Sequence, residues 1–499
     1  MAKVLLFNPR SANNKPRIPN SILSIASSIE GIFDYVIVDG NLEHDPWKKI
    51  EAYLQTGTIK YVGITAMPGP QLKQAIPVSK NIRKDWPSIQ IIWGGYFASN
   101  QPKVVLFSGY VDFVVNGPGE KAFPALLNAL EKDQPVDKVP NLIYRINGKL
   151  KKYLRDELYE PDTLPLLPYE KLNQFYPIQR YLGKTYLGSR TIAYHSSYGC
   201  PFTCSFCAVV PIYNARWKGR SAPLIYKDIK HLKETYGGTA IEFHDNNFFV
   251  SEKRTVAFSR LIKPEKMNWW GEGRIDTVDK YSDESLALMR ESGCRMIFFG
   301  AETGNDELLK KMDKGGTLSA DSMRKFAARM ARFDIVPEYS FVLGTPAETP
   351  EKVAAQIELD IAFIREIKQI NPATEIIIYV YSPVPVEGSD LYEKVLASGF
   401  RFPATLEEWI DPRWENFDLR KNPLTPWLEP SMISRIKDFE TVLNGYYPTV
   451  SDIRMSTFKR KLIRQVASLR YRTGLYYKPY ELKALQRWWK YRQPEIQGF

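Results

Sequence analysis

Short apolar runs alternate with longer amphipathic segments in two separate blocks of the chain, and this alternation restricts the fold more than any other feature. In the first block we predict strands at residues 3–8, 35–39, 61–65, 91–93 and 113–115, with helices at 22–29, 47–54, 71–84 and 120–130. Strands that alternate with helices form a parallel sheet with crossover helices. The sequence therefore predicts an α/β fold that begins with a doubly wound, Rossmann-like domain over residues 1–135.

The segment from 136 to 188 has a different character. Residues 141–146 and 149–153 read as a hairpin around Asn147 and Gly148, a dipeptide that favours a tight turn. Proline is frequent from Pro161 to Pro168, which is typical of a linker between domains.

The second block repeats the alternation six times. Predicted strands lie at 191–195, 240–244, 269–273, 296–300, 338–343 and 375–379, and helices at 222–236, 252–262, 283–292, 320–333 and 350–367. Six strand–helix units predict a partial (β/α)6 barrel of the TIM type over residues 189–400. The chemistry of such a barrel gathers at the carboxyl ends of its strands.

Residues 401–499 are expected to form a helical, basic and aromatic-rich extension. The net charge of the chain is +12, and residues 451–499 hold twelve Lys/Arg against three Asp/Glu. Basic residues mixed with aromatics can bind nucleic acid or a membrane surface. We favour a solvated appendage that packs its aromatic rings on the main body, and we expect no nucleic-acid partner.

The first ten residues read as a strand and are too short in their apolar part for a secretory signal. No apolar run reaches the roughly 18 residues that span a bilayer. The expected location is the cytoplasm.

Three of the four cysteines lie within eight residues, spaced C-x3-C-x2-C, directly after the first predicted strand of the second block. In a reducing compartment such clustering indicates metal rather than disulfides. Thiolates this close can each bind a different iron of one cubane. A structural zinc is the alternative, but Cys294 is distant in sequence and His195 would be a fourth ligand only by accident of folding. We predict that the metal ligands are Cys200, Cys204 and Cys207, with Cys294 a buried core thiol.

The cysteine loop, with Phe206 before its last cysteine, resembles the signature of the radical S-adenosylmethionine (SAM) enzymes. Further segments resemble that family in order: Glu242–Phe248, Gly300–Gly304, Leu343–Thr349 and Ser382–Tyr392. The resemblance implies a [4Fe–4S] cluster whose open iron chelates SAM, a 5′-deoxyadenosyl radical, an external low-potential electron donor and a small-molecule substrate. The SAM contacts it implies are Phe206, Asp245, Arg274, Glu302 and Gly344. Among these, Glu302 would accept hydrogen bonds from SAM and Arg274 would pair with the SAM carboxylate.

The first domain resembles the cobalamin-binding domain of the B12-dependent radical SAM enzymes. The cobalamin contacts that this implies are Asn8, Asp39, Thr65, Gly94, Gly95, Tyr96, Gly117 and Glu120. One departure concerns cobalt: Asn41 stands where the D-x-H-x-x-G motif of other B12 proteins has its cobalt-binding histidine, and His44 lies three residues too late. We therefore predict cobalamin bound without a histidine ligand; the alternative is a vestigial domain that only shapes the substrate pocket.

The resemblance implies a C-methyltransferase in which cobalamin carries a methyl group from SAM. The alternative is an oxidative cyclase or rearrangement enzyme without methyl transfer, like the anaerobic cyclase of bacteriochlorophyll synthesis. A tRNA-modifying enzyme is a third reading, supported only by the basic tail. The aromatic content of 13% would suit a flat or apolar substrate, although aromatic residues fill cores more often than pockets.

Overall fold

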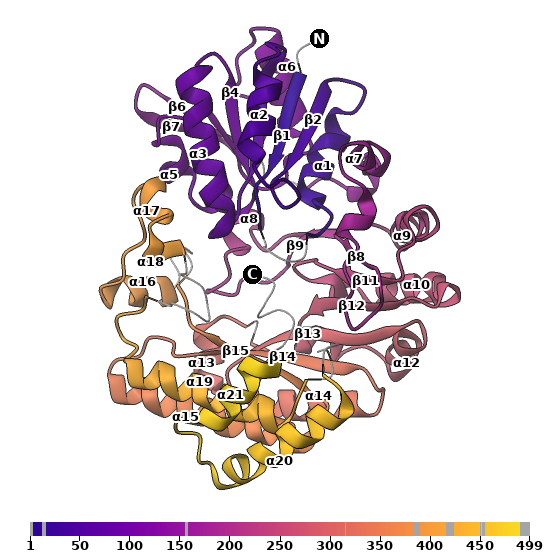
Figure 1. Ribbon diagram of the computed structural model, residues 1–499, viewed down its shortest axis with the longest axis vertical. Coiled ribbons are helices and arrows are strands. Elements are labelled where there is room, and N and C mark those ends of the chain that lie inside the picture. The colour runs from indigo at the N-terminus through magenta and orange to yellow at the C-terminus, as the bar shows by residue number, and fades with distance from the viewer. Residues whose placement is uncertain are drawn as a thin grey trace.

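The computed structural model describes residues 3–11, 16–154, 158–314, 316–383, 390–415, 424–449, 451 and 455–489. Two sheets lie one above the other along the long axis of the molecule, and the C-terminal helices cover the lower one (Figure 1). The C-terminal segment 390–415, drawn in orange, runs up the side of the molecule to the first sheet, and we call this segment the strap.

The first sheet has seven strands in the order β2-β1-β3-β4-β5-β6-β7. Five are parallel: β1 (Lys3–Asn8), β2 (Asp34–Asp39), β3 (Ile59–Thr65), β4 (Gln90–Gly94) and β5 (Phe113–Val115). The hairpin β6 (Leu142–Ile146) and β7 (Lys149–Tyr153) extends the sheet in the antiparallel sense. The predicted hairpin is thus part of the first sheet.

Helices cover both faces of this sheet, as the predicted doubly wound fold requires. The main ones are α1 (Asn20–Ile29), α2 (Pro46–Leu54), α3 (Pro70–Asp85) and α6 (Ala122–Glu131). Val4 and Leu6 belong to the core on the side of α1 and α6, whereas Leu5 and Phe7 belong to the core on the side of α2 and α3. Successive side chains of a strand point to opposite faces, so this run of β1 is buried on both sides.

Two short helices in this domain were not predicted from the sequence. These are α4 (Gly95–Asn100), which begins directly after β4, and α5 (Pro102–Leu106). Each spans fewer than two turns, which is too short for helical periodicity to be recognised. The linker also contains regular structure: η1 (Pro161–Thr163), α7 (Tyr169–Phe175) and η2 (Ile178–Tyr181).

The second sheet has six parallel strands in the order β15-β14-β13-β12-β11-β8. They are β8 (Thr191–Tyr194), β11 (Ala240–Phe243), β12 (Asn268–Gly273), β13 (Cys294–Glu302), β14 (Val336–Leu343) and β15 (Glu375–Val380). The outer layer is formed by α9 (Ala222–Tyr236), α10 (Glu252–Ile262), α12 (Asp283–Glu291), α14 (Ala320–Ala331) and α15 (Pro350–Ile370). Among the described residues β8 and β15 are the two edges, which confirms the predicted partial barrel.

The C-terminal region is helical, as predicted. Its helices are α16 (Asp390–Ala397), α17 (Leu406–Trp409), α18 (Pro412–Glu415), α19 (Pro430–Tyr446), α20 (Thr457–Thr473) and α21 (Tyr480–Trp489). The strap reaches the first domain, where the rings of Trp409 and Phe97 meet edge to face with their centroids 5.2 Å apart. No helix of the described residues is long and apolar enough to cross a membrane.

The interpretation of the tail as a packed appendage is correct for only part of it. Tyr471 and Tyr476 are buried in the core that α19 shares with α15. Tyr477 and Trp488, by contrast, leave 66% and 83% of their surface exposed.

Candidate active site between the two sheets

The cysteine loop follows β8 and the short strand β9 (Ser197–Gly199), at the carboxyl end of the barrel where it was predicted. Gly199 has a φ of +73°, and a Cβ there would lie 2.2 Å from the carbonyl oxygen of Arg216. Only glycine fits this reversal of the chain. The loop is then anchored on the chain after β13, because the Ser205 amide donates to the carbonyl of Met312 at 3.0 Å.

The three thiols lie in an environment that fits an iron–sulfur cluster. Burial raises the pKa of Cys200, and it raises that of Cys207 to about 11, with smaller contributions from the neighbouring thiols. Donors approach the sulfurs: Arg274 Nη1 lies 3.1 Å from Cys204 Sγ, and Asn247 Nδ2 lies 3.9 Å from Cys200 Sγ. Hydrogen bonds to the sulfurs are among the features that tune such clusters.

The ligand set of the loop fits a [4Fe–4S] cluster better than the zinc alternative. A structural zinc usually takes four protein ligands, whereas the loop supplies three thiols, each of which can bind a different iron of one cubane. Cys294, the remaining cysteine, is fully buried in the core of the barrel.

Asp245, a predicted SAM contact, holds the chain that leads into the cysteine loop. It is fully buried, and it accepts hydrogen bonds from the Ser196 amide at 3.1 Å, the Ser196 hydroxyl at 2.9 Å and the Ser197 hydroxyl. The guanidinium of Arg254 donates to the carbonyl and the hydroxyl of Ser196. A contact between Asp245 and SAM stays a prediction.

Arg274 and Phe206 also lie against the loop. The guanidinium of Arg274 is held by Asp276 at 2.9 and 2.7 Å and lies over the ring of Phe202. Phe206 faces the ammonium of Lys314, 5.7 Å from its ring centre. In this structure Arg274 therefore holds the cysteine loop; its pairing with the SAM carboxylate stays a prediction.

Glu302 ends β13 in a left-handed conformation with a φ of +65°, and it is almost fully buried. Lys314 Nζ lies 2.9 Å from its carboxylate. Asp360 on α15 stabilises the turn that follows Glu302. Its carboxylate accepts hydrogen bonds from the Thr303 hydroxyl at 2.7 Å and the Gly304 amide at 2.8 Å. Burial raises the pKa of Asp360 from 3.8 to about 6, although these hydrogen bonds oppose the shift.

Gly344, the remaining predicted SAM contact, follows β14 with a φ of +83°. Its carbonyl accepts from the indole of Trp427 at 2.9 Å, and a Cβ there would lie 2.7 Å from Leu428. The chain before α19 therefore covers this strand end. Of the family-like segment Ser382–Tyr392, residues 384–389 lie outside the described residues.

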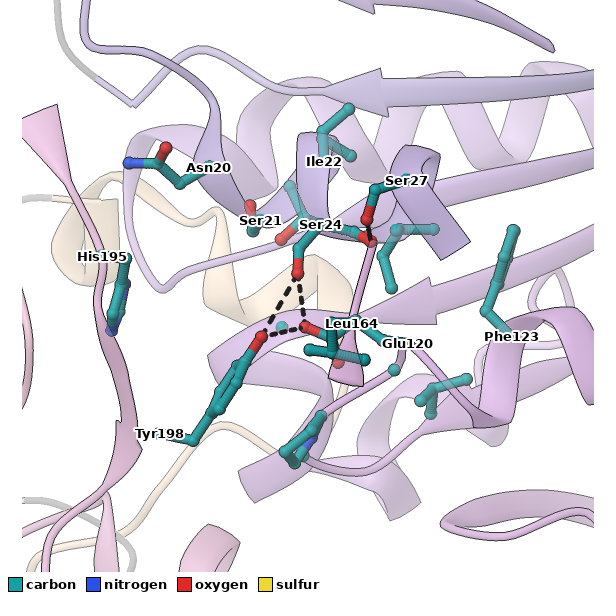
Figure 2. Close-up of a pocket in the computed structure, with 18 of the residues that line it drawn as sticks. Asn20, Ser21, Ile22, Ser24, Ser27, Glu120, Phe123, Leu164, His195 and Tyr198 are labelled. Carbon is teal, nitrogen blue, oxygen red and sulfur yellow. Dashed lines mark hydrogen bonds between the residues drawn. The ribbon is translucent and has the colours of Figure 1, made fainter. Parts of the chain in front are cut away.

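A cavity of about 240 Å³ lies between the carboxyl ends of the first sheet and the start of the barrel (Figure 2). It brings together five of the predicted cobalamin contacts. These are Thr65, Gly94, Gly95, Gly117 and Glu120. The barrel contributes His195, Ser196, Ser197 and Tyr198 to the opposite wall.

Glu120 links the parts of the chain that enclose the cavity. Its carboxylate accepts from the hydroxyls of Ser24 on α1, Tyr198 in β9 and Tyr159 in the linker, as Figure 2 shows for the first two. Neither Ser24, Tyr159 nor Tyr198 was predicted. Nothing in the sequence marks them, because they meet Glu120 only through the fold.

The lining of the cavity fits the nucleotide tail of cobalamin. Leu6, Ile92 and Phe123 supply apolar surface for an aromatic base, and serine hydroxyls line the same cavity. The Asn20 side chain on this wall has a buried Oδ1 without a donor among the described residues, which a ligand could satisfy. Gly94 leaves open space, since a Cβ there would meet nothing closer than 4.0 Å.

Asn8, Asp39 and Tyr96 do not line this cavity. Asn8 Nδ2 donates to Asp39 at 3.0 Å, and Tyr181 of the linker covers the same carboxylate with a 2.8 Å hydrogen bond. The linker helices thus close this part of the strand edge. Tyr96 instead belongs to α4, whose Asn100 donates to the carbonyl of Ala208 directly after the last cysteine of the loop. Burial and the neighbouring Cys207 raise the pKa of Tyr96.

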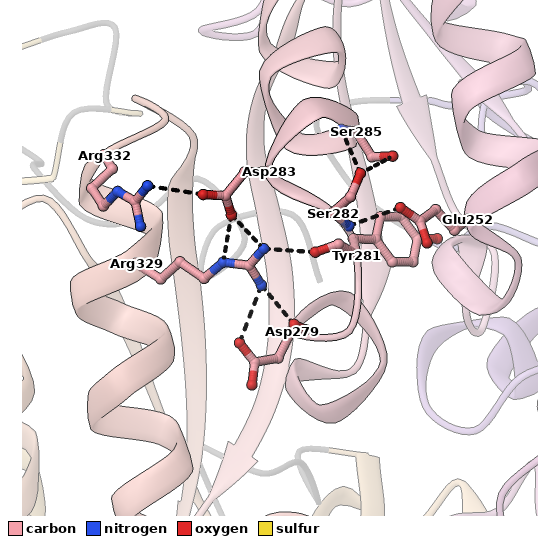
Figure 3. A network of polar contacts seen from close by, with 8 residues as sticks. All are labelled: Glu252, Asp279, Tyr281, Ser282, Asp283, Ser285, Arg329 and Arg332. Carbon is pink, nitrogen blue, oxygen red and sulfur yellow. Dashed lines mark hydrogen bonds and ion pairs between the residues drawn. The ribbon is translucent and has the colours of Figure 1, made fainter.

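A dense ion-pair network on the barrel lies among the outer helices (Figure 3). Arg329 on α14 binds Asp283 at 2.7 Å and the carbonyl of Tyr281 at 2.6 Å, and Arg332 binds Asp283 at 2.8 Å. These partly exposed pairs tie α12 to α14, and they supply no group to the cysteine loop or the cavity.

Comparison with known proteins agrees with both halves of this site. Residues 17–127 match the model of the B12 binding domain, and residues 194–359 match that of the radical SAM superfamily. The fold and the cysteine loop thus define a radical SAM protein. More particularly, the chain belongs to the B12-binding-domain radical SAM enzymes, whose cofactors are a [4Fe–4S] cluster, SAM and cobalamin.

Two relatives of this chain carry different kinds of name. It is 27% identical to an uncharacterized methyltransferase, PH0819, of Pyrococcus horikoshii, over 87% of this chain and 94% of the relative. It is 23% identical to the anaerobic magnesium-protoporphyrin IX monomethyl ester cyclase of Cereibacter sphaeroides, over 83% of this chain and 64% of the relative.

Two solved structures share the fold at low sequence identity. The radical SAM methyltransferase TsrM of Kitasatospora setae superposes with a TM-score of 0.65 at 16% identity, covering 98% of this chain and 99% of TsrM. The cobalamin-dependent SAM radical enzyme OxsB superposes with a TM-score of 0.70 at 15% identity, covering 94% of this chain and 71% of OxsB.

Proposed function

We propose that this chain is a cobalamin-dependent radical SAM C-methyltransferase. The observation that carries the proposal is the contact between the cobalamin-binding edge and the cysteine loop. Asn100 of α4 donates to the carbonyl of Ala208 at 3.2 Å, and Tyr96 of the same helix lies near Cys207. Both cofactors would therefore act in one enclosed space, as methyl transfer to a substrate radical requires. The methyltransferase name of the Pyrococcus relative supports the same activity.

When bound, the cluster and SAM supply a 5′-deoxyadenosyl radical, and cobalamin supplies the methyl group. The chain's own residues position these groups. Glu302, held by Lys314, presents an acceptor for the ribose or ammonium of SAM. The thiols are held by the anchored loop and by Arg274. Asp245 and Arg254 fix the approach to that loop.

The barrel interior is the proposed substrate site. Trp269 and Phe299 are buried beneath the outer helices, so their neighbours Trp270 and Phe298 point to the inner face of the sheet. The rings of Trp270 and Phe298 lie 6.4 Å apart, and the indole of Trp270 lies 3.3 Å from Glu338. Partly exposed aromatic rings beside a carboxylate suit a flat or apolar small molecule that carries a donor group.

Product analysis with SAM carrying a labelled methyl group tests the proposal. The reconstituted enzyme, supplied with cobalamin, a low-potential reductant and a cytoplasmic metabolite extract, should place the label in a carbon-bound methyl group of a product. An oxidative cyclase, which the cyclase relatives favour as the second candidate, would also release 5′-deoxyadenosine but would leave the label in SAM and methionine, with none in a carbon-bound methyl group. We place the reaction in the cytoplasm, where a low-potential electron donor keeps the cluster reduced.

A further inference from the structure

The last two helices present apolar side chains to solvent. On α20, Phe458, Leu462, Val466 and Leu469 follow one another at intervals of four, four and three residues, which places them on one face of the helix. Phe458 and Leu469 are 73% and 70% exposed. The opposite face of α20 packs inward through Ile463, Ala467 and Tyr471. The exposed stripe is therefore not needed to hold the helix in place.

The helix α21 lies antiparallel beside α20 and presents a stripe of its own. Arg470 binds Glu481 near one end of the pair, and Lys459 lies over the ring of Trp489 near the other. Tyr480, Ala484 and Trp488 are exposed at intervals of four residues. Leu475 and Tyr477, in the turn between the helices, are also exposed. We call these exposed residues of α20, α21 and their turn, together with the half-buried Leu462, the terminal stripe.

Positive charge surrounds the terminal stripe. Residues 455–489 contain nine Lys/Arg and one acidic residue, Glu481, which gives a net charge of +8. Lys461 and Arg472 are exposed on α20 on the side of the stripe away from Val466, and Arg487 is exposed next to Trp488 on α21. Tyr and Trp beside Lys and Arg form the combination that sits at the boundary between lipid headgroups and acyl chains.

From the terminal stripe and its basic border we infer that α20 and α21 dock this enzyme on an anionic membrane surface. Leu462, Val466 and Leu469 would enter the acyl boundary, and the surrounding lysines and arginines would lie among anionic headgroups. An RNA partner fits less well, because a phosphate backbone gains nothing from an aliphatic stripe. The enzyme would thus be held at the bilayer by a surface distinct from the cysteine loop and the cobalamin cavity.

Sedimentation of the full-length, cofactor-loaded enzyme with phospholipid vesicles tests this. We expect it to bind vesicles that contain phosphatidylglycerol at least about tenfold more tightly than vesicles of phosphatidylcholine alone, and to dissociate as salt is raised. The double variant Phe458→Ser/Leu469→Ser should bind the anionic vesicles about tenfold more weakly. Lys461→Glu/Arg472→Glu should weaken binding by a similar factor.

Leu359→Ser is the matched control, because Leu359 is a 41% exposed leucine on α15, outside the two helices; it should bind like the wild type. Circular dichroism of each variant should match that of the wild type, since all substituted positions except Leu359 lie on the outer face of α20. Equal binding to neutral and anionic vesicles, or unchanged binding by the double serine variant, would refute the inference. So would binding of the wild type to RNA without binding to vesicles.

Discussion

Replacing Asp360 by asparagine should change how the stability of the barrel depends on pH. The carboxyl is fully buried, and its pKa in the folded chain is about 6, against 3.8 for the unperturbed group. A raised carboxyl pKa means that folding disfavours the ionised form. The wild type therefore loses stability as the pH rises from the unfolded pKa to the folded one, by about 3 kcal/mol in all. The asparagine side chain of the variant carries no charge at any of these pH values.

Between about pH 5 and about pH 8 roughly half of this loss occurs, so the wild type should fall by about 1.4 kcal/mol relative to the Asp360→Asn variant. For a barrel of roughly 200 residues, this free-energy difference corresponds to about 3 °C in the midpoint of thermal unfolding. Both Thr303 and Gly304 donate to the same oxygen of Asp360, which the amide oxygen of asparagine can replace. The Gln356 amide donates to the other oxygen at 3.1 Å, and the asparagine NH2 group loses that bond by the same amount at both pH values. Scanning calorimetry of both proteins at the two pH values measures the difference. If it stays constant from about pH 5 to about pH 8, the raised pKa is wrong.

Four further outcomes concern the cofactors. Replacing Cys200, Cys204 or Cys207 by alanine should abolish iron binding, measured by metal analysis. The Cys294→Ala variant should still bind iron. Gly95→Val should lower cobalamin retention, read from the absorbance spectrum, without loss of iron, because Gly95 has a φ of +84° and a Cβ there would lie 2.7 Å from Thr65 Oγ1. Glu302→Gln should weaken SAM binding about tenfold in calorimetry while the cluster spectrum stays unchanged, and normal affinity would remove Glu302 from the SAM site. Paramagnetic resonance of the Co(II) form should show no nitrogen splitting from the protein; splitting that disappears in His195→Ala would contradict this, since His195 lines the cavity.

Much of the fold was predictable because it depends on local pattern. The strand Lys3–Asn8 and the helices Ala222–Tyr236 and Glu252–Ile262 have the predicted bounds. Their apolar residues recur with the period of the element, and glycine or proline stands near their ends. The cysteine loop was equally predictable, because its three ligands lie close together in the sequence.

Contacts between distant segments were not predictable. The sequence placed Asp39 at a ligand-binding strand end, and the strand does end there, but Tyr181 covers the carboxylate from 142 residues further along the chain. Lys314 pairs with Glu302, and Tyr198 meets Glu120, through packing that no spacing encodes. Such partners depend on how the two sheets and the linker dock, which is a property of the whole fold.

The hydroxyl bonds to Glu120 have a consequence for the order of assembly. The cobalamin cavity is walled by two folded units and the linker, and one carboxylate ties Ser24, Tyr159 and Tyr198 together across them. Docking of the barrel on the first domain forms these hydrogen bonds, and cobalamin that arrives afterwards would have to open the junction against them. We therefore expect loading to precede the final docking of the barrel on the first domain. Once formed, the same hydrogen bonds would slow the release of cobalamin.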